Sequence, residues 1–224
     1  MNATALVRAG LRVCSMPAVT PVVFIVDDDI SVRESLELLV AHSGWRAELF
    51  ASGQEFLARP RPSGPGCLVL DVSLPDLNGL ELQKRVAGDG QNLPIVFITG
   101  HGDIPMTVRA MKAGAVEFLT KPLVAEVLVG AIRNAIERSS AALSEQTNLQ
   151  ILRQRYDALS DRERDVIALV VKGQLNKQVG GVLGISEITV KAHRGRMMKK
   201  MRARSLAELV KMAARLGIET AGED

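Results

Sequence analysis

The chain has 224 residues, 47% of them hydrophobic and 3% aromatic, so it is long enough for one or two packed domains. It contains no apolar stretch of membrane-spanning length, and its cysteines, Cys14 and Cys67, suggest neither a disulfide nor a metal framework. Residues 1–140 contain 13 basic and 15 acidic side chains, whereas residues 141–224 contain 15 and 10. These features argue against a membrane protein, favour the reducing cytoplasm, and predict an acidic partner for the second half.

Residues 1–20 show no strand or helix pattern. Arg8 and Arg12 interrupt the apolar residues, so this stretch lacks the continuous apolar segment of a signal peptide. We expect a disordered N-terminal extension that ends before Pro21, with Met16 as an alternative translation start. A functional arm is the other interpretation.

Short apolar runs alternate with helical patterns in the first 138 residues. The runs predict strands at 22–26, 45–50, 66–70, 94–99 and 116–119, and the segments between them predict helices at 30–43, 53–59, 79–87, 104–113 and from 123 onward. Strands that are apolar throughout are typical of a parallel sheet buried on both faces, with right-handed helical crossovers. We therefore expect an α/β domain.

Polar side chains follow or end four of these strands. Asp27 and Asp28 follow the first strand, Asp71 the third and Lys121 the fifth, and Thr99 ends the fourth. In parallel sheets, ligands bind at the carboxyl ends of the strands, so these groups should meet at one edge. Three neighbouring carboxylates repel one another unless a cation such as Mg²⁺ neutralises them, and that ion then favours a phosphoryl group.

The stretch from Ala131 to Lys172 contains neither glycine nor proline, and its apolar residues recur at loosely helical spacing. We expect the helix that starts at 123 to continue into a helical linker over residues 139–159. If the helix is interrupted, the sequence places the break at Ser139-Ser140. A flexible polar tether is the alternative.

Four further helices are predicted after the linker. Ser160, with Glu163 three residues later, forms a capping box for a helix that reaches Lys172. Shorter patterns follow at 176–183, at 187–201 after the cap Ser186, and at 205–216. This order is typical of a helix-turn-helix whose third helix reads DNA. Between Glu187 and Arg204 there are seven basic residues and one acid, which favours a nucleic-acid surface over a merely solvated helix face.

The motifs of the first half are Val26-Asp27-Asp28, Leu70-Asp71 with Leu74-Pro75-Asp76 and Gly79, Ile98-Thr99-Gly100, and Lys121-Pro122. In this order, residues 21–138 resemble the receiver domain of two-component response regulators, and residues 160–224 resemble a LuxR-type helix-turn-helix domain. The whole is similar to the FixJ/NarL class of transcription regulators. The resemblance implies a doubly wound, five-stranded parallel sheet of order 2-1-3-4-5, followed by an all-α four-helix domain.

The resemblance also implies roles for the strand-end residues. Asp71 is the expected phosphoacceptor. Mg²⁺ is expected on Asp28, Asp71 and the Ser73 carbonyl, with Asp27 holding a metal-bound water. Lys121 and Thr99 are expected to contact phosphoryl oxygens, and Phe118 occupies the aromatic switch position. His101 lies where the family tunes dephosphorylation, and the Lys121-Pro122 bond is usually cis in the family. From its position before the first helix, Asp29 is expected to be a helix cap.

DNA-contacting residues are expected on the third and second helices of the LuxR-type domain. Lys191 and Ala192 are assigned to bases, and Asn176 and Lys177 to the DNA backbone. Phosphate contacts are assigned to Thr189, His193, Arg196 and Lys200. Gly195 stands where some relatives place a contacting side chain, and Gly180-Gly181 interrupts the second helix.

These observations predict a phosphorylation-dependent transcription regulator and not an enzyme. Its expected partners are a sensor histidine kinase, promoter DNA, RNA polymerase and, once phosphorylated, a second copy that pairs through Met106, Arg109, Ala110 and Met111 near Val116. A dehalogenase-class phosphatase would need an acid at Ser73. An RNA-binding antiterminator would lack the basic helix-turn-helix, and a ligand-sensing LuxR protein would lack the acidic receiver set.

Overall fold

The computed structural model describes residues 20–60, 64–88, 93–100 and 102–219. The chain divides into two compact units, Met1–Ala141 and Ala142–Asp224, which are described separately below. Within the described residues, no helix has both the length and the apolar character needed to cross a membrane. The expected N-terminal extension, up to residue 19, and His101 lie outside the described residues.

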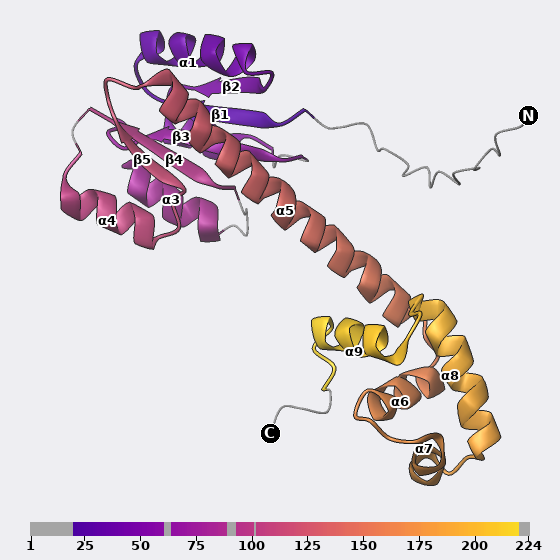
Figure 1. Ribbon diagram of the computed structural model, residues 1–224. Coiled ribbons are helices and arrows are strands. Elements are labelled where there is room, and N and C mark those ends of the chain that lie inside the picture. The colour runs from indigo at the N-terminus through magenta and orange to yellow at the C-terminus, as the bar shows by residue number, and fades with distance from the viewer. Residues whose placement is uncertain (1–19, 61–63, 89–92, 101, 220–224) are drawn as a thin grey trace, which may run out of the picture. The chain divides into compact units, whose positions relative to one another are not determined.

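The first unit contains a parallel sheet of the expected order, β2-β1-β3-β4-β5 (Figure 1). Its strands and the helices between them confirm the α/β pattern predicted from the sequence, with bounds that differ by a few residues at most. The elements are β1 Val22–Val26, α1 Ile30–His42, β2 Arg46–Phe50, α2 Gly53–Ala58, β3 Gly66–Asp71, α3 Gly79–Gly88, β4 Ile95–Thr99, α4 Ile104–Lys112 and β5 Glu117–Thr120, followed by α5 Ala125–Asp157.

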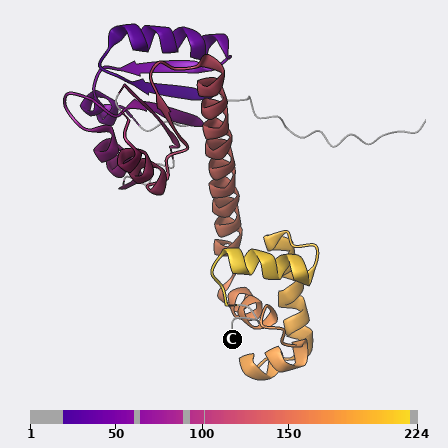
Figure 2. The same cartoon turned by 60° about the vertical axis from the view of Figure 1, so that its left-hand side comes forward.

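Alternate residues of each strand point to opposite faces of the sheet, and each face has its own core. Val23 and Ile25 belong to the core that α1 and α5 cover, which also contains Leu36 and Ile132. Phe24 and its strand neighbours on the other face pack with α2, α3 and α4. The two layers of helices lie on either side of the strands (Figure 2). Burial on both faces explains why the strands are apolar at nearly every position.

Helix α5 is continuous through Ser139 and Ser140, the position at which the sequence predicts any break. The Ser139 side chain is buried, and its hydroxyl oxygen accepts a hydrogen bond of 3.1 Å from the backbone N–H of Gly66 at the start of β3. A serine that faces the sheet in this way has its polar group satisfied, so it does not interrupt the helix. Ser139 therefore belongs to the first unit, one residue beyond the end expected for the receiver domain.

The second unit contains the four expected helices, α6 Asp161–Val170, α7 Asn176–Leu183, α8 Glu187–Met201 and α9 Leu206–Arg215. Ser160 and Glu163 form the predicted capping box, and Ser186 caps α8 by accepting from the N–H of Thr189. Gly184 makes the turn between α7 and α8 in the left-handed conformation, with φ of 67°. The core of this unit includes Val166, Val179, Val190, Met197 and Leu209.

Candidate functional site

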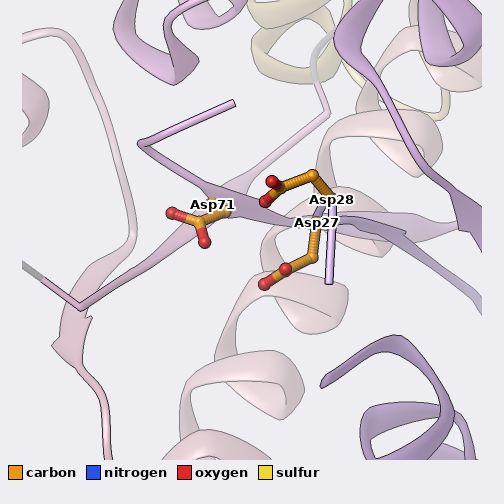
Figure 3. Close-up of side chains that lie close together, drawn as sticks. All are labelled: Asp27, Asp28 and Asp71. Carbon is orange, nitrogen blue, oxygen red and sulfur yellow. The ribbon is translucent and has the colours of Figure 1, made fainter. Parts of the chain in front are cut away.

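Three carboxylates meet at the carboxyl ends of β1 and β3, as the sequence predicts (Figure 3). One oxygen each of Asp27, Asp28 and Asp71 lies within 4.8 Å of the others. Asp27 and Asp71 are buried, whereas Asp28 is exposed. The cluster is thus anchored in the core on one side and open to solvent on the other, so it is accessible to a solvated ion or to a phosphoryl donor.

Lys121 binds two of the three carboxylates. Its ammonium donates to Oδ2 of Asp27 and to Oδ2 of Asp71, and both distances are 2.7 Å. Burial lowers the pKa of Lys121, but the hydrogen bonds and charges of Asp27 and Asp71 outweigh this effect and raise it above its usual value. Burial also raises the pKa of Asp27, although Lys121 opposes that change. Lys121 therefore remains a cation and offsets part of the negative charge.

Backbone N–H groups fix the directions of these carboxylates. Asp27 Oδ1 accepts from the N–H of Asp29 at 3.0 Å, and Asp71 Oδ1 accepts from the N–H of Ser73 at 2.9 Å. Asp29 caps α1, as predicted, by accepting from the N–H of Ser31 at 2.8 Å. The Ser73 side chain is exposed. The peptide bond between Lys121 and Pro122 is cis, as expected.

The loop after β3 depends on two residues whose role was not predicted. The N–H of Gly79 donates to the carbonyl of Val72 at 3.0 Å, and a Cβ at Gly79 would lie 2.6 Å from the carbonyl oxygen of Asp71. Only glycine permits this close approach. The Asp76 carboxylate accepts from the N–H groups of Gly53 and Gln54, so it caps α2 and holds the loop against that helix.

Thr99 and Phe118 lie on the neighbouring strands β4 and β5. Thr99 is fully buried, and the ring of Phe118 is half-buried at 6.0 Å from the ring of Phe97. A Cβ at Gly102 would lie 3.1 Å from the Phe118 ring and 3.2 Å from Cγ2 of Thr99. The loop that starts α4 is therefore packed on both residues, which links them physically to α4.

The expected contact face on α4 needs correction. Ala110, which the sequence assigns to this face, is buried in the core next to α3, and the nearby Val116 is buried in the core on the opposite side of the sheet. Ala110 lies on the inner side of the amphipathic helix, and its carbonyl accepts a hydrogen bond from the Gln83 side chain. The exposed apolar residues of α4 are instead Ile104, Val108 and Met111.

In the second unit, α8 presents one side to the core and the opposite side to solvent. Val190, Met197 and Met201 are buried. Lys191, Ala192 and Arg196 are exposed, as expected for residues that contact DNA. Lys177 on α7 is exposed as well.

The remaining predicted DNA contacts already have partners or are less accessible. The side-chain oxygen of Asn176 accepts from Arg194 at 3.0 Å, which joins α7 to α8, and the hydroxyl of Thr189 is 2.8 Å from that of Ser186. His193 is half-buried, and its Nδ1 has no hydrogen-bond partner among the described residues. Of these side chains, Asn176 joins two helices of the helix-turn-helix, whereas Thr189 contacts the cap of its own helix.

Lys200 is held by α6. Its ammonium donates to Oε2 of Glu163 at 2.7 Å and to the carbonyl of Ala158 at 3.1 Å. Glu163 is almost fully buried, so it depends on this cation and on the N–H of Ser160 for its hydrogen bonds. The capping box identifies Glu163 in the sequence, but its second partner lies 37 residues away. This partner competes with the phosphate contact predicted for Lys200.

Comparison with known proteins agrees with this architecture. Residues 23–133 match the response regulator receiver domain, and residues 157–213 match the bacterial regulatory proteins of the luxR family. Nodulation protein W of Bradyrhizobium diazoefficiens is 50% identical, over 88% of this chain and 87% of its own length. The transcriptional regulatory protein FixJ of Rhizobium meliloti is 42% identical, over 85% and 94%.

A solved structure of the response regulator StyR covers 88% of this chain and 100% of its own, with a TM-score of 0.80 and 45% identity. Identity at this level over most of both chains is evidence of common family membership as well as common fold. The chain therefore belongs to the two-component response regulators that carry a LuxR-type DNA-binding domain, a family of transcription regulators rather than enzymes.

Proposed function

We propose that Asp71 accepts a phosphoryl group from a sensor histidine kinase and that this modification controls DNA binding. The observation that supports the proposal most directly is the position of the Asp71 carboxylate. One of its oxygens is 2.7 Å from the Lys121 ammonium, and two further carboxylates lie beside it. A nucleophilic oxygen, a cation for the incoming phosphoryl group and a set of metal ligands are thus adjacent.

The donor set fits Mg²⁺. This ion prefers oxygen ligands and retains several waters, so one exposed and two buried carboxylates at the edge of the sheet suit it. We assign Asp28, Asp71 and the Ser73 carbonyl to the metal, with Asp27 holding a bound water. When bound, the metal neutralises negative charge on the phosphoryl oxygens.

The transfer itself requires little beyond positioning. A carboxylate oxygen of Asp71 attacks phosphorus, a new O–P bond forms, and the N–P bond to the kinase histidine breaks, leaving the electron pair on the histidine nitrogen. Lys121, already beside Asp71, then contacts a phosphoryl oxygen as a compact charge. We assign a second phosphoryl oxygen to the Thr99 hydroxyl.

The kinase is proposed to rest against α1 and the start of α5. A cavity of about 390 Å³ lies there, lined by Val32, Leu36, Leu39 and Leu123 with Lys121 at its border. It is mainly apolar and reaches a residue that binds Asp71 directly, so a protein seated on it would be beside the acceptor.

We propose that phosphorylation is relayed through Thr99 and Phe118 to α4, and that the protein then pairs with a second copy. The packing of Gly102 on both side chains supports the relay. The exposed apolar row Ile104, Val108 and Met111 supports the pairing surface. A twofold dimer suits two DNA half-sites, which it would bind with a gain in effective concentration. Contact with RNA polymerase at the promoter is part of the same proposal.

For promoter DNA, we propose base contacts from Lys191 and Ala192. The phosphate and backbone contacts are assigned to Asn176, Lys177, Thr189, His193, Arg196 and Lys200. The exposure of Lys191, Arg196 and Lys177 supports this assignment, whereas the ion pair of Lys200 with Glu163 limits the part that Lys200 plays.

The acceptor is tested by labelling the full chain with acetyl phosphate and Mg²⁺. Asp71→Asn should abolish the hydroxylamine-labile label, because an amide is a poor nucleophile. Asp103→Asn is the matched control: Asp103 caps α4, asparagine caps a helix equally well, and labelling should persist. Undiminished label on Asp71→Asn would place the acceptor elsewhere. Asp28→Asn should mainly raise the Mg²⁺ concentration that labelling requires.

A further inference from the structure

The outward ridge of α8 is apolar at its amino-terminal end. Ile188, in the first turn of the helix, has 82% of its surface exposed. Val190, Met197 and Met201 define the buried side of α8. With 3.6 residues per turn, the ridge opposite to them consists of Ile188, Ala192, Gly195 and Lys199, all of which are exposed.

After Ile188, the next two positions of this ridge carry little side-chain bulk. Ala192 has a single methyl group, and a Cβ built on Gly195 would meet nothing within 4 Å, so no side chain in the described part of the chain covers the ridge there. Helical spacing places Lys191 on one flank and Arg196 on the other, and both are exposed. An apolar crest between two cations has the chemistry of the major groove, whose walls are phosphates and whose floor includes thymine methyl groups.

We infer that Ile188 is a specificity-determining residue that recognises the 5-methyl group of a thymine in each DNA half-site. This inference rests on the DNA binding described above and adds a determinant to it. The amino-terminal turn of a reader helix is the part that reaches base edges, and Ile188 lies there. The methyl group of Ala192 and the absence of a side chain at Gly195 let the helix approach the groove floor closely enough for the methyl contact.

The test uses the full-length protein and a duplex selected by it from a random pool. Each thymine of the selected site is replaced in turn by deoxyuridine, which lacks only the methyl group. Loss of one buried methyl should weaken binding about fourfold at one position of each half-site. In the Ile188→Ala variant, the same replacement should have no effect, because the partner of the methyl group is missing.

Ile151→Ala is the matched control, since Ile151 is an exposed isoleucine of the same unit outside the reader helix. It should show the same fourfold sensitivity as the original chain. The inference is overturned if deoxyuridine does not change the duplex affinity of the original chain. It is also overturned if deoxyuridine lowers the affinity of Ile188→Ala by the same factor as that of the original chain. Either result would leave DNA binding itself intact. Failure to select any preferred duplex would instead count against the proposed function.

Discussion

The α-carbon of Gly79 lies so close to the carbonyl oxygen of Asp71 that a methyl group cannot be placed between them; a Cβ would be 2.6 Å from that oxygen. Gly79, which follows the Leu74-Pro75-Asp76 motif, therefore packs directly against the backbone of the proposed phosphoacceptor. The first prediction follows from this contact.

Gly79→Ala should lower the free energy of unfolding of the first unit by about 1–3 kcal/mol, as overpacking generally does. It should also slow labelling by acetyl phosphate, because the Asp71 backbone must move. Gly181→Ala is the opposite case: its Cβ meets nothing within 4 Å on α7, so it should stabilise the second unit by about 0.5–1 kcal/mol. Urea titration and labelling rates measure both changes. Equal stabilities for the Gly79→Ala variant and the original chain would contradict the packing argument.

The second prediction concerns the ion pair of Glu163 and Lys200. Lys200→Met should lower the free energy of unfolding by about 1–3 kcal/mol, because Glu163 stays buried without its cation; partial exposure of Lys200 limits the effect. Lys199→Met, at an exposed neighbour with no ion pair among the described residues, should change stability by less than about 0.5 kcal/mol. Thermal and urea unfolding distinguish the two variants. If Lys199→Met lowers the free energy of unfolding as much as Lys200→Met does, the ion pair of Glu163 and Lys200 is not the cause.

The same pair predicts a pH dependence. Burial by itself raises the pKa of Glu163, but the hydrogen bond of Lys200, the N–H of Ser160 and the Lys200 charge outweigh it, so the folded pKa lies below the ordinary value of 4.5. The stabilisation is therefore present above pH 4.5 and is lost as the pH falls through the folded pKa. Glu163→Gln should flatten this part of the stability profile. A profile unchanged by that substitution would assign the acid sensitivity to other carboxylates.

The third prediction concerns Cys67. Burial in β3 raises the pKa of its thiol to about 12 from an ordinary 9.0. At about pH 8, the thiolate population should be roughly a thousandfold smaller than for a free thiol. In a Cys14→Ser background, aromatic disulfide reagents should therefore label Cys67 only when the first unit unfolds. Rapid labelling of the folded chain would mean that β3 opens locally.

The fourth prediction concerns pairing. Beryllofluoride, which mimics the phosphoryl group, should convert the protein from monomer to dimer in sedimentation velocity. Met111→Glu should prevent the dimer without preventing phosphorylation, because it places a charge on the exposed row of α4. Leu38→Glu, at an apolar residue of α1 that is more exposed than Met111, should dimerise normally. A saturated protein that stays monomeric yet gains DNA affinity would favour release of a covered DNA-binding surface over dimerisation.

The fifth prediction concerns salt. Arg196→Ala should weaken binding to specific and random duplexes equally and lower the slope of log affinity against log salt by about one unit. Lys191→Ala should in addition relax sequence preference. Nitrocellulose filter binding at several salt concentrations measures both effects, and identical losses on all sequences for both variants would contradict the base contact of Lys191.

The positions of the strand-end residues could be predicted because each follows an apolar run, and the topology of parallel sheets brings such positions together. Asp27, Asp28, Asp71 and Lys121 are adjacent for this reason. The ion pair of Glu163 could not be predicted, because the capping box already explains why a glutamate lies three residues after Ser160, and the motif gives no sign of Lys200.

Burial on α4 was harder to predict than the helix itself. The sequence assigns Ala110 to one face together with its neighbours Arg109 and Met111, yet only every third or fourth residue of a helix shares a face, and Ala110 is buried whereas its two neighbours are exposed. Ser139 shows a related limit. Serine at the end of a helical pattern indicates a cap or a break, and only its hydrogen bond to Gly66 across the sheet shows that the helix continues.

The alternation of strand residues between two separate cores has a practical consequence. Ile25 supports the side covered by α1 and α5, whereas Phe24, its immediate neighbour, supports the side of α2, α3 and α4. The proposed kinase surface and the proposed pairing surface thus rest on different sets of buried side chains. Ile25→Val should therefore loosen the packing under the proposed kinase surface and Phe24→Leu the packing under the proposed pairing surface, although the two residues are adjacent in the sequence.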